Sequence, residues 1–157
     1  MKINTRAAKD TEVASIKGMA IGNAWEILSE DQRRELDKEK WSRRVGELFD
    51  MATKQESHKV FVAEDENQSF LGYVWVGEGI HAIAGTKHGY VYDMFVKEEH
   101  RRKGVGMMLM EKAERYCREI GYHEMLLMVA IHNQPAKKLY TKQGFKAEQM
   151  YMLKRLT

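Results

Sequence analysis

Cysteine and proline are nearly absent from the sequence, which contains one of each in 157 residues. The single cysteine, Cys117, cannot form a disulfide within the chain, so we expect a reducing, cytoplasmic environment. No apolar run approaches the length that crosses a membrane, and the first residues lack the apolar segment of a secretory signal. Because no stretch has the composition of a flexible linker, we expect a single domain over residues 1–157.

A large excess of one charge is also missing. Lys and Arg total 26 against 23 acidic residues, which gives a net charge of +3, and no long run carries a single sign. This balance suits an anionic small ligand and argues against a nucleic-acid partner, as does the lack of aromatic residues interleaved with the basic ones. With 43% hydrophobic and 31% charged residues, the composition is that of a globular protein with its own core.

Hydrophobic periodicity predicts an alternation of strands and helices. The expected strands are 2–7, 58–64, 69–76, 90–96, 124–130 and 145–156, and the continuous apolar run in 124–130 is typical of a strand buried on both faces. The expected helices are 11–23, 31–54, 105–120 and 134–143. The glycine-rich residues 77–89 are expected to form a long hairpin loop. Residues 90–130 read as strand, helix, strand, which predicts two parallel strands joined by a right-handed crossover.

The most informative stretch is 91–106, in which a strand, a charged turn and a glycine-containing loop precede a helix. Its loop has the form Arg-x-x-Gly-x-Gly, from Arg101 to Gly106. N–H groups at a helix start lack partners within the helix and lie at the positive end of its dipole, which favours an anion. Gly104 and Gly106 permit unusual φ angles and close backbone approach, as a pyrophosphate requires. Alone, the pattern is equally compatible with a basic strand-to-helix turn, and it is neither a Walker loop nor a dinucleotide fingerprint.

Three other pieces of sequence accompany this loop in a fixed order. The first piece, Met94-Phe95-Val96, precedes the loop sequence His100 to Gly106. The other two follow it and are Asn133-Gln134-Pro135-Ala136 and Leu139-Tyr140-Thr141-Lys142-Gln143-Gly144-Phe145. Together the four pieces resemble the GNAT superfamily of acetyl-CoA-dependent N-acyltransferases. The resemblance covers about residues 90–145. It implies an α/β fold with a mixed, mostly antiparallel sheet of about six strands, flanked by about four helices and splayed between two parallel central strands. A bulge near Met94 is the usual way to splay them.

The resemblance also implies acetyl-CoA as the cosubstrate. Backbone groups of Met94, Phe95 and Val96 would pair with the pantetheine arm as if it were an added strand. Asn133 and Ala136 would lie beside the pantetheine, and Tyr140 near the thiol. The pyrophosphate would be held by the loop residues Arg101, Arg102, Lys103, Gly104, Val105 and Gly106.

Transfer to a primary amine requires that the amine lose a proton before attack and that the leaving thiolate gain one. Tyr140 is the candidate acid, although without the family its helical position would indicate an ordinary core aromatic. Asp93 either acts as the base, directly or through water, or binds a cationic amine. If Met94 and Val96 share one face of their strand, Asp93 and Phe95 share the other. The N–H group of Phe95 or Val96 could polarise the thioester carbonyl.

Other reactive residues fit simpler roles. Glu98 and Glu99 are expected to be solvated turn residues. His81 and His88 have no cysteine or acidic residue at metal-binding spacing, so we expect surface histidines and no metal site. Cys117 lies on an apolar helical face, which favours a core position over a nucleophile.

These patterns predict an N-acetyltransferase that moves the acetyl group of acetyl-CoA directly to a primary amine: a protein N-terminus, a lysine, a polyamine or a small amine. A catalytically weak CoA-sensing module is the alternative. Many family members place a two-strand hairpin after the residues equivalent to Gly144-Phe145, whereas here there is room for one long strand or a very tight hairpin. The acceptor pocket is therefore expected either to be more open or to be completed by a second subunit in a homodimer.

Overall fold

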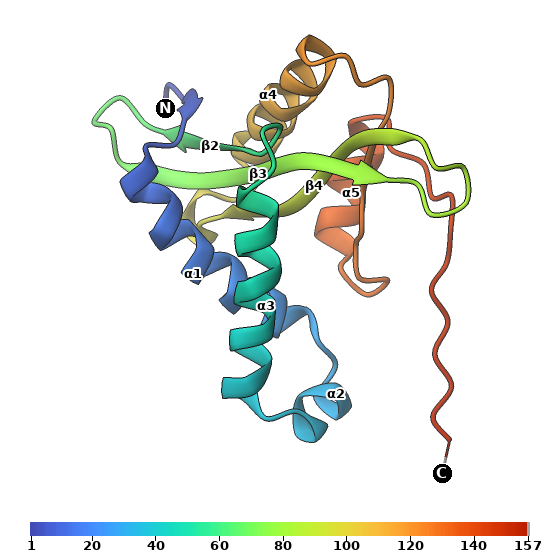
Figure 1. Ribbon diagram of the computed structural model, residues 1–157. Coiled ribbons are helices and arrows are strands. Elements are labelled where there is room, and N and C mark those ends of the chain that lie inside the picture. The colour runs from blue at the N-terminus through green and yellow to red at the C-terminus, as the bar shows by residue number, and fades with distance from the viewer. Residues whose placement is uncertain (157) are drawn as a thin grey trace.

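A five-stranded mixed sheet forms the centre of the molecule in a computed structural model that describes residues 1–156 (Figure 1). The strands follow chain order across the sheet, β1-β2-β3-β4-β5, with antiparallel pairs except for the parallel pair β4–β5. Their bounds are β1 Asn4–Ala7, β2 Lys59–Glu64, β3 Phe70–Ile80, β4 Lys87–Val96 and β5 Met125–Leu127. The predicted mixed, mostly antiparallel α/β fold is confirmed.

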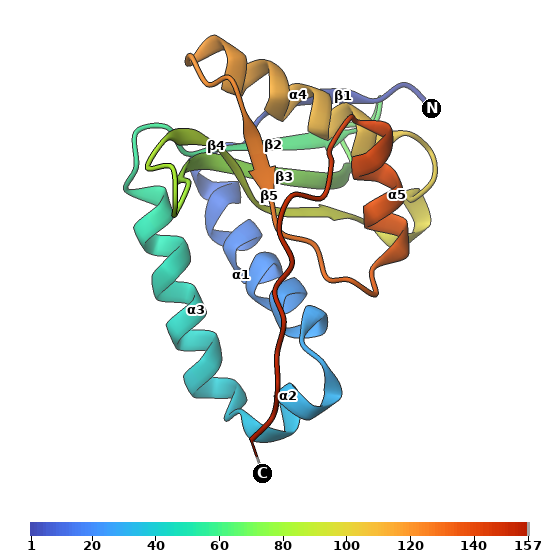
Figure 2. The same cartoon turned by 90° about the vertical axis from the view of Figure 1, so that its right-hand side faces the viewer.

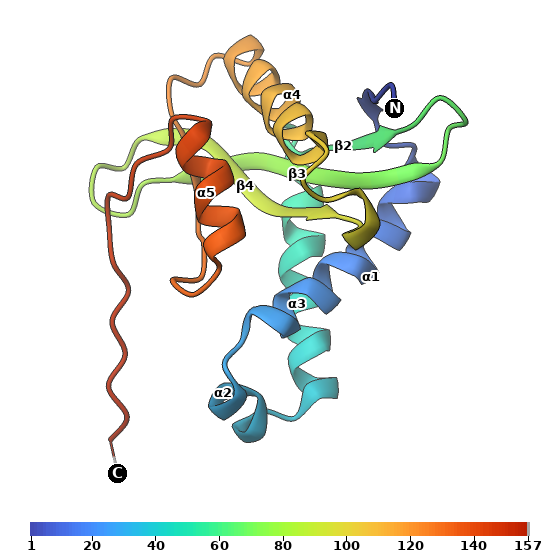
Figure 3. The same ribbon diagram turned by 180° about the vertical axis from the view of Figure 1, so that it is seen from behind.

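Helices cover both faces of this sheet. Helix α4 (Val105–Glu119) packs on one face, and helices α1 (Asp10–Ile27) and α3 (Lys38–Thr53) lie on the other (Figure 2). The short helix α2 (Glu30–Glu35) joins the ends of α1 and α3 that lie furthest from the sheet (Figure 3). Helix α5 (Gln134–Lys142) lies beside the start of α4, where Leu139 approaches Gly106. The core is accordingly divided by the sheet into two clusters, one under α4 and one under α1 and α3.

Helix α4 follows directly from its sequence. Val105, Leu109, Ala113 and Cys117 repeat every four residues and are all buried against the sheet. The helix ends before Gly121, whose φ of 93° is in the left-handed region that glycine adopts without strain.

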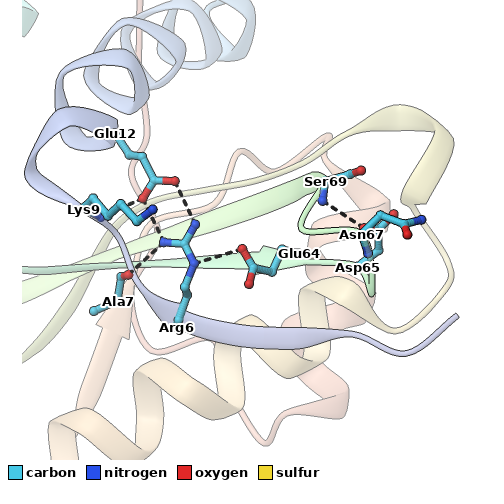
Figure 4. A network of polar contacts seen from close by, with 8 residues as sticks. All are labelled: Arg6, Ala7, Lys9, Glu12, Glu64, Asp65, Asn67 and Ser69. Carbon is cyan, nitrogen blue, oxygen red and sulfur yellow. Dashed lines mark hydrogen bonds and ion pairs between the residues drawn. The ribbon is translucent and has the colours of Figure 1, made fainter.

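An ion-pair cluster fixes the start of α1 against the sheet (Figure 4). The Arg6 guanidinium forms two hydrogen bonds of 2.9 Å to the carboxylate of Glu12 on α1, and its Nε donates at 2.9 Å to Glu64 on β2. Glu12 also accepts from the N–H group of Lys9 at the helix start. These donors lower the pKa of Glu12 to about 2, so the carboxylate stays charged near neutral pH. The cluster joins β1, α1 and β2, which sets where the rest of α1 lies over the sheet.

Two local predictions were wrong, one because a helix start was missed and one because turn signals were assigned too broadly. The single charged helix 31–54 is two helices, because Asp37 begins a new one by accepting a 2.9 Å hydrogen bond from the N–H of Lys40. The long loop 77–89 is mostly strand, since β3 extends to Ile80 and β4 begins at Lys87. His88 is therefore a buried strand residue, 3% exposed, and not a surface histidine.

The expected count of about six strands and four helices also differs from the structure, in which residues 1–156 contain five strands and five α-helices. The predicted strand 145–156 is absent, and its residues 146–156 are exposed and lie in no helix or strand. Strand β5 is consequently an edge strand, half-buried and only three residues long, and Met128 directly after it is 78% exposed. The apolar run 124–130 predicted a strand buried on both faces, and that prediction was wrong, because Met125, Leu126 and Leu127 are only half-buried at the edge of the sheet.

No helix within residues 1–156 is long and apolar enough to cross a membrane.

Candidate active site

The two parallel strands of the sheet separate halfway along β4. Strand β4 pairs with β5 from Gly89 to Val91, and the last of these residues lies opposite Leu127. Beyond Val91, β4 continues to Val96 while pairing only with β3. The backbone edge of Met94, Phe95 and Val96 that faces β5 therefore pairs with no other strand, as the pantetheine prediction requires.

A bulge in β4 determines which side chains reach each face of the sheet. Val91 lies opposite Val76 and Asp93 lies opposite Trp75, which leaves Tyr92 as an extra residue without a partner on β3. Because of this residue, Tyr92 and Asp93 both point toward α1 and α3. The bulge lies two residues before Met94, close to the position expected.

Beyond the bulge, the side chains of β4 alternate as predicted. Met94 and Val96 pack in the cluster under α4, and Phe95 packs in the cluster under α1. Asp93 lies on the same face as Phe95, where it meets a side chain of α1. The predicted separation of these four residues into two pairs is confirmed.

The basic loop, residues 101–106, presents a row of free backbone donors. Gly104 is the N-cap of α4 with φ of 85°, and Arg102 is also left-handed with φ of 60°. None of the N–H groups from Arg102 to Met107 donates a hydrogen bond within the described chain. Such orphan donors at a helix start fit the oxygens of a pyrophosphate. The side chains of Arg101, Arg102 and Lys103 are exposed beside them.

Two residues of this loop have roles that differ from the expected ones. The N–H of Arg101 is already bonded to Glu98, and its side-chain Nε donates at 3.1 Å to the carbonyl of Val96, so Arg101 ties the loop to the end of β4. Gly106 does not have a positive φ, and that part of the expectation was wrong. A Cβ at Gly106 would lie 3.1 Å from Leu139, so this glycine instead lets α5 approach α4.

A hydrogen-bonded group of three side chains, here called the carboxylate network, lies on the α1 side of β4. The Tyr73 hydroxyl donates to Oδ2 of Asp93, and Nδ2 of Asn23 lies 3.3 Å from both of these oxygen atoms. Burial raises the pKa of Asp93 above its ordinary value, although these hydrogen bonds oppose the shift. Burial and the adjacent carboxylate raise the pKa of Tyr73, which keeps it a donor.

Tyr73 and Asn23 are not among the site residues predicted from the sequence. Tyr73 lies on β3, and Asn23 lies near the end of α1. Their alignment with Asp93 depends on the strand register and on the packing of α1, and neither leaves a local signal in the sequence.

The remaining predicted residues lie on α5. The side-chain oxygen of Asn133 accepts a 3.2 Å hydrogen bond from the N–H of Ala136, which confirms the predicted helix cap and leaves the amide NH₂ of Asn133 for other partners. Tyr140 is partly buried in the cluster under α4 and stacks edge-to-face on Phe145. Burial, and then the negative charge of Asp93, raise the pKa of Tyr140 to about 12. The charge of Asp93 therefore affects the pKa of Tyr140, while Asp93 bonds to α1 and Tyr140 packs in the cluster under α4.

An open hollow of about 330 Å³ adjoins the bulge on the same side of the sheet as Tyr92. No lysine or arginine lines it, and Glu78 is its one acidic residue. Its lining consists of Glu78, Gly79, Ile80, His81, Ala82, His88, Tyr90, Tyr92, Leu126 and Gln149.

Other reactive residues lie apart from this arrangement. Glu98 and Glu99 are exposed in a short 3-10 helix (Glu98–His100), as expected. Cys117 is buried at 3% exposure, where burial raises the pKa of its thiol to about 11, so it is a core residue. Over residues 1–156, no group of three or more His, Cys, Asp or Glu side chains is arranged to hold a metal ion.

A mixed sheet whose parallel strands diverge beside an unpaired strand edge, with free N–H groups at the next helix start, offers a site for an extended ligand that carries an anionic group. A family model agrees: the acetyltransferase (GNAT) family matches residues 23–145. The chain belongs to this family, and its class is that of the acyltransferases.

Relatives extend the match over the whole chain. A proposed acetyl transferase from Pyrococcus furiosus has a solved structure that superimposes with a TM-score of 0.82 and 29% identity, over 99% of this chain and 100% of that one. The uncharacterized N-acetyltransferase YhfO of Bacillus subtilis (strain 168) is 24% identical over 146 residues, which is 93% of this chain and 91% of YhfO. Another curated relative, also from Bacillus subtilis, matches at 32% identity over 57% of this chain but only 55% of its own length.

The fold is also that of AAC(6′)-Iy, which was solved in complex with the bisubstrate analog CoA-S-monomethyl-acetylneamine. That structure has a TM-score of 0.70 and 16% identity, and the match covers 100% of this chain and 99% of that one.

Proposed function

We propose that this protein transfers the acetyl group of acetyl-CoA directly to a primary amine. The observation that carries the proposal is the position of Asp93. It is a partly buried carboxylate with a raised pKa, beside the open edge of β4 and close enough to Tyr140 to raise that residue's pKa as well. A proton acceptor and a proton donor thus flank the place where a thioester bound along β4 would present its carbonyl.

Different residues would bind different parts of the cosubstrate. The open edge of Met94, Phe95 and Val96 would accept the pantetheine arm, and the donors of the basic loop would accept the pyrophosphate. The amide NH₂ of Asn133 faces no other acceptor among the described residues and would contact the arm beside Ala136. The bound cosubstrate would supply the activated acetyl group.

The reaction then needs two proton movements. The amine nitrogen attacks the acetyl carbonyl carbon, the carbon–sulfur bond breaks, and an amide bond forms. Asp93 takes the proton that the amine loses, directly or through a water, and its raised pKa makes it a stronger base than an exposed aspartate. Tyr140 is protonated at neutral pH because its pKa is about 12, and it donates to the departing thiolate. No acyl-enzyme is required.

The hollow beside the bulge supports an acceptor with positive charge. Its one acidic lining residue is Glu78, which pairs with Lys87 at 3.1 Å, and the rings of Tyr90 and Tyr92 offer faces to a cation. An anionic acceptor would meet no lysine or arginine there. Amines of this kind include lysine, polyamines, protein N-termini and small diamines.

A thiol-release assay with acetyl-CoA and a panel of amines tests the proposal. We expect release of free CoA with at least one di- or polyamine and none with a matched hydroxyl compound that lacks the amine. Thermal unfolding with CoA is measured in parallel, and a rise in the midpoint is expected. Stabilisation without turnover on any amine would indicate the CoA-sensing module instead, and no stabilisation at millimolar CoA would contradict both functions.

A further inference from the structure

Asn23 brings a side chain of α1 into the carboxylate network. Ile16 and Ala20, seven and three residues before it, are buried at 1% and 0% exposure, so Asn23 lies on the face of α1 that is turned toward the sheet. Its Nδ2 atom lies 3.3 Å from the Tyr73 hydroxyl and 3.3 Å from Oδ2 of Asp93. The network therefore includes one residue from a helix, together with one each from β3 and β4.

The orientation of the Asn23 amide follows from these neighbours. A carboxylate only accepts hydrogen bonds, so the amide atom beside Asp93 is the NH₂ group, whose two hydrogens suffice for the two oxygens. The carbonyl oxygen of Asn23, Oδ1, forms no hydrogen bond within residues 1–156. Over the same residues, Nδ1 of His100 is the only buried side-chain nitrogen or oxygen without a partner, so solvent reaches Oδ1 of Asn23. A ligand can therefore reach it too.

Asp93 also has an oxygen to spare. Its Oδ2 atom accepts from Tyr73 and Asn23, whereas its Oδ1 atom receives no side-chain donor within the described chain. No lysine or arginine among residues 1–156 forms an ion pair with this carboxylate. A partly buried carboxylate without a cation is costly unless a partner supplies the charge. Asn23 and Asp93, which are joined through Nδ2 and Oδ2, each offer a free oxygen to a cationic donor.

We propose that Asn23 recognises the acceptor as a primary amine, with its Oδ1 atom accepting one N–H of the ammonium group while Asp93 accepts another. A primary ammonium group has three hydrogens and can donate to both oxygens, whereas a hydroxyl group has one hydrogen and can donate to only one of them. Asn23 is thus a specificity-determining residue that also holds Asp93 in place. The inference rests on the proposed function, because it assigns the acceptor amine to this site.

Two probes of equal charge test the proposal by binding. Butylamine and N,N-dimethylbutylamine each carry one positive charge at neutral pH, but the ammonium group of the first has three hydrogens and that of the second has one. Thermal unfolding of the full chain with saturating CoA and increasing amine gives the dissociation constants, with no acetyl group present to be transferred. We expect the unmodified protein to bind butylamine at least about tenfold more tightly, because a hydrogen bond to a charged group contributes that much.

Asn23→Leu keeps the approximate size of the side chain and removes both polar groups of the amide. We expect it to reduce the selectivity for butylamine about tenfold. Tyr73→Phe is the matched control, because it also removes one donor to Oδ2 of Asp93 but leaves the amide of Asn23, and it should keep the selectivity. Circular dichroism checks the fold of each variant, and Asn23→Ala takes the place of the leucine variant if that one does not fold.

The outcomes separate amine recognition from acetyl transfer. Unmodified protein that binds both amines equally, or neither, would overturn the proposal. Selectivity that survives in Asn23→Leu, or that falls equally in Tyr73→Phe, would also overturn it, because Asn23 itself would then not select the amine. Release of CoA from acetyl-CoA with butylamine is measured separately. Selective binding that depends on Asn23 without any release would contradict the proposed transfer reaction and support the recognition of the amine.

Discussion

The two sides of the end of β4 are built in opposite ways. On the α1 side, the polar atoms of Asn23, Tyr73 and Asp93 bond to one another. On the loop side, the N–H groups from Arg102 to Met107 have no acceptor within residues 1–156. The polar side chains on the α1 side are hydrogen-bonded without a ligand, whereas the loop side has N–H donors without acceptors.

This difference suggests different roles for the two sides: the carboxylate network is preorganised for catalysis, and the basic loop binds the cosubstrate. A carboxylate held by two donors keeps its position when the site is empty, which favours a role in catalysis. A row of orphan donors gains hydrogen bonds only when an anion arrives, so it contributes to affinity. Changes to the carboxylate network should therefore alter turnover, and changes to the basic loop should alter CoA affinity.

The largest effect is expected for Asp93→Asn, which keeps the shape of the side chain but removes the base. We predict that kcat/KM falls by about 10²–10⁴-fold while CoA affinity, measured by calorimetry, is unchanged. Glu98→Gln removes an exposed carboxylate near the end of the same strand and is the control. Equal losses in the two variants would mean that negative charge near the site, and not a base at Asp93, supports the reaction.

Tyr140→Phe should have the next largest effect. It removes the hydroxyl proton and keeps the ring that stacks on Phe145, so we predict that kcat falls by about 10²-fold with little change in stability. Acetyl donors with a leaving thiol more acidic than CoA should recover much of the rate, because they need less protonation. Turnover equal to that of the unmodified protein would remove Tyr140 as the acid.

Two glycines allow the loop side to be tested with a matched pair. Gly104 and Gly121 have φ angles of 85° and 93°, lie at opposite ends of α4, and have open space where a Cβ would be. Replacement by alanine should cost each about 1 kcal/mol of stability. Only Gly104→Ala should also weaken CoA binding, by about tenfold or 1.4 kcal/mol. Equal CoA affinities in the two variants would mean that the loop does not bind the pyrophosphate.

The smallest effect is expected for Tyr73→Phe. The Tyr73 hydroxyl lowers the pKa of Asp93, so its loss raises that pKa further. Since Asp93 must be ionised to accept a proton, the acidic limb of kcat/KM should move to higher pH. The pH profiles of kcat/KM for the variant and the unmodified protein measure this shift. A uniform loss of rate at all pH values would indicate a structural role alone.

The loop side of this comparison could be predicted from the sequence, but of the carboxylate network only Asp93 could. Gly104 and the cap at Asn133 act on neighbouring residues, so their spacing along the chain is enough to identify them. Tyr73 and Asp93 meet only because β3 and β4 pair in one register, and Asn23 reaches them only because α1 is fixed at its start by Arg6. The role of Gly106 was missed for the same reason, since Leu139 lies on another helix.

The extra residue in β4 has a consequence for how this family member can diversify. Removing Tyr92 would leave Asp93 and Met94 on their present faces, because Val91 and Asp93 already lie opposite adjacent residues of β3. Adding one residue to the regular part of the strand directly before Asp93 would instead turn Asp93 toward α4 and Met94 toward α1, which places a carboxylate in an apolar core. Close descendants that keep the activity should therefore tolerate loss of the bulge residue better than an insertion after it.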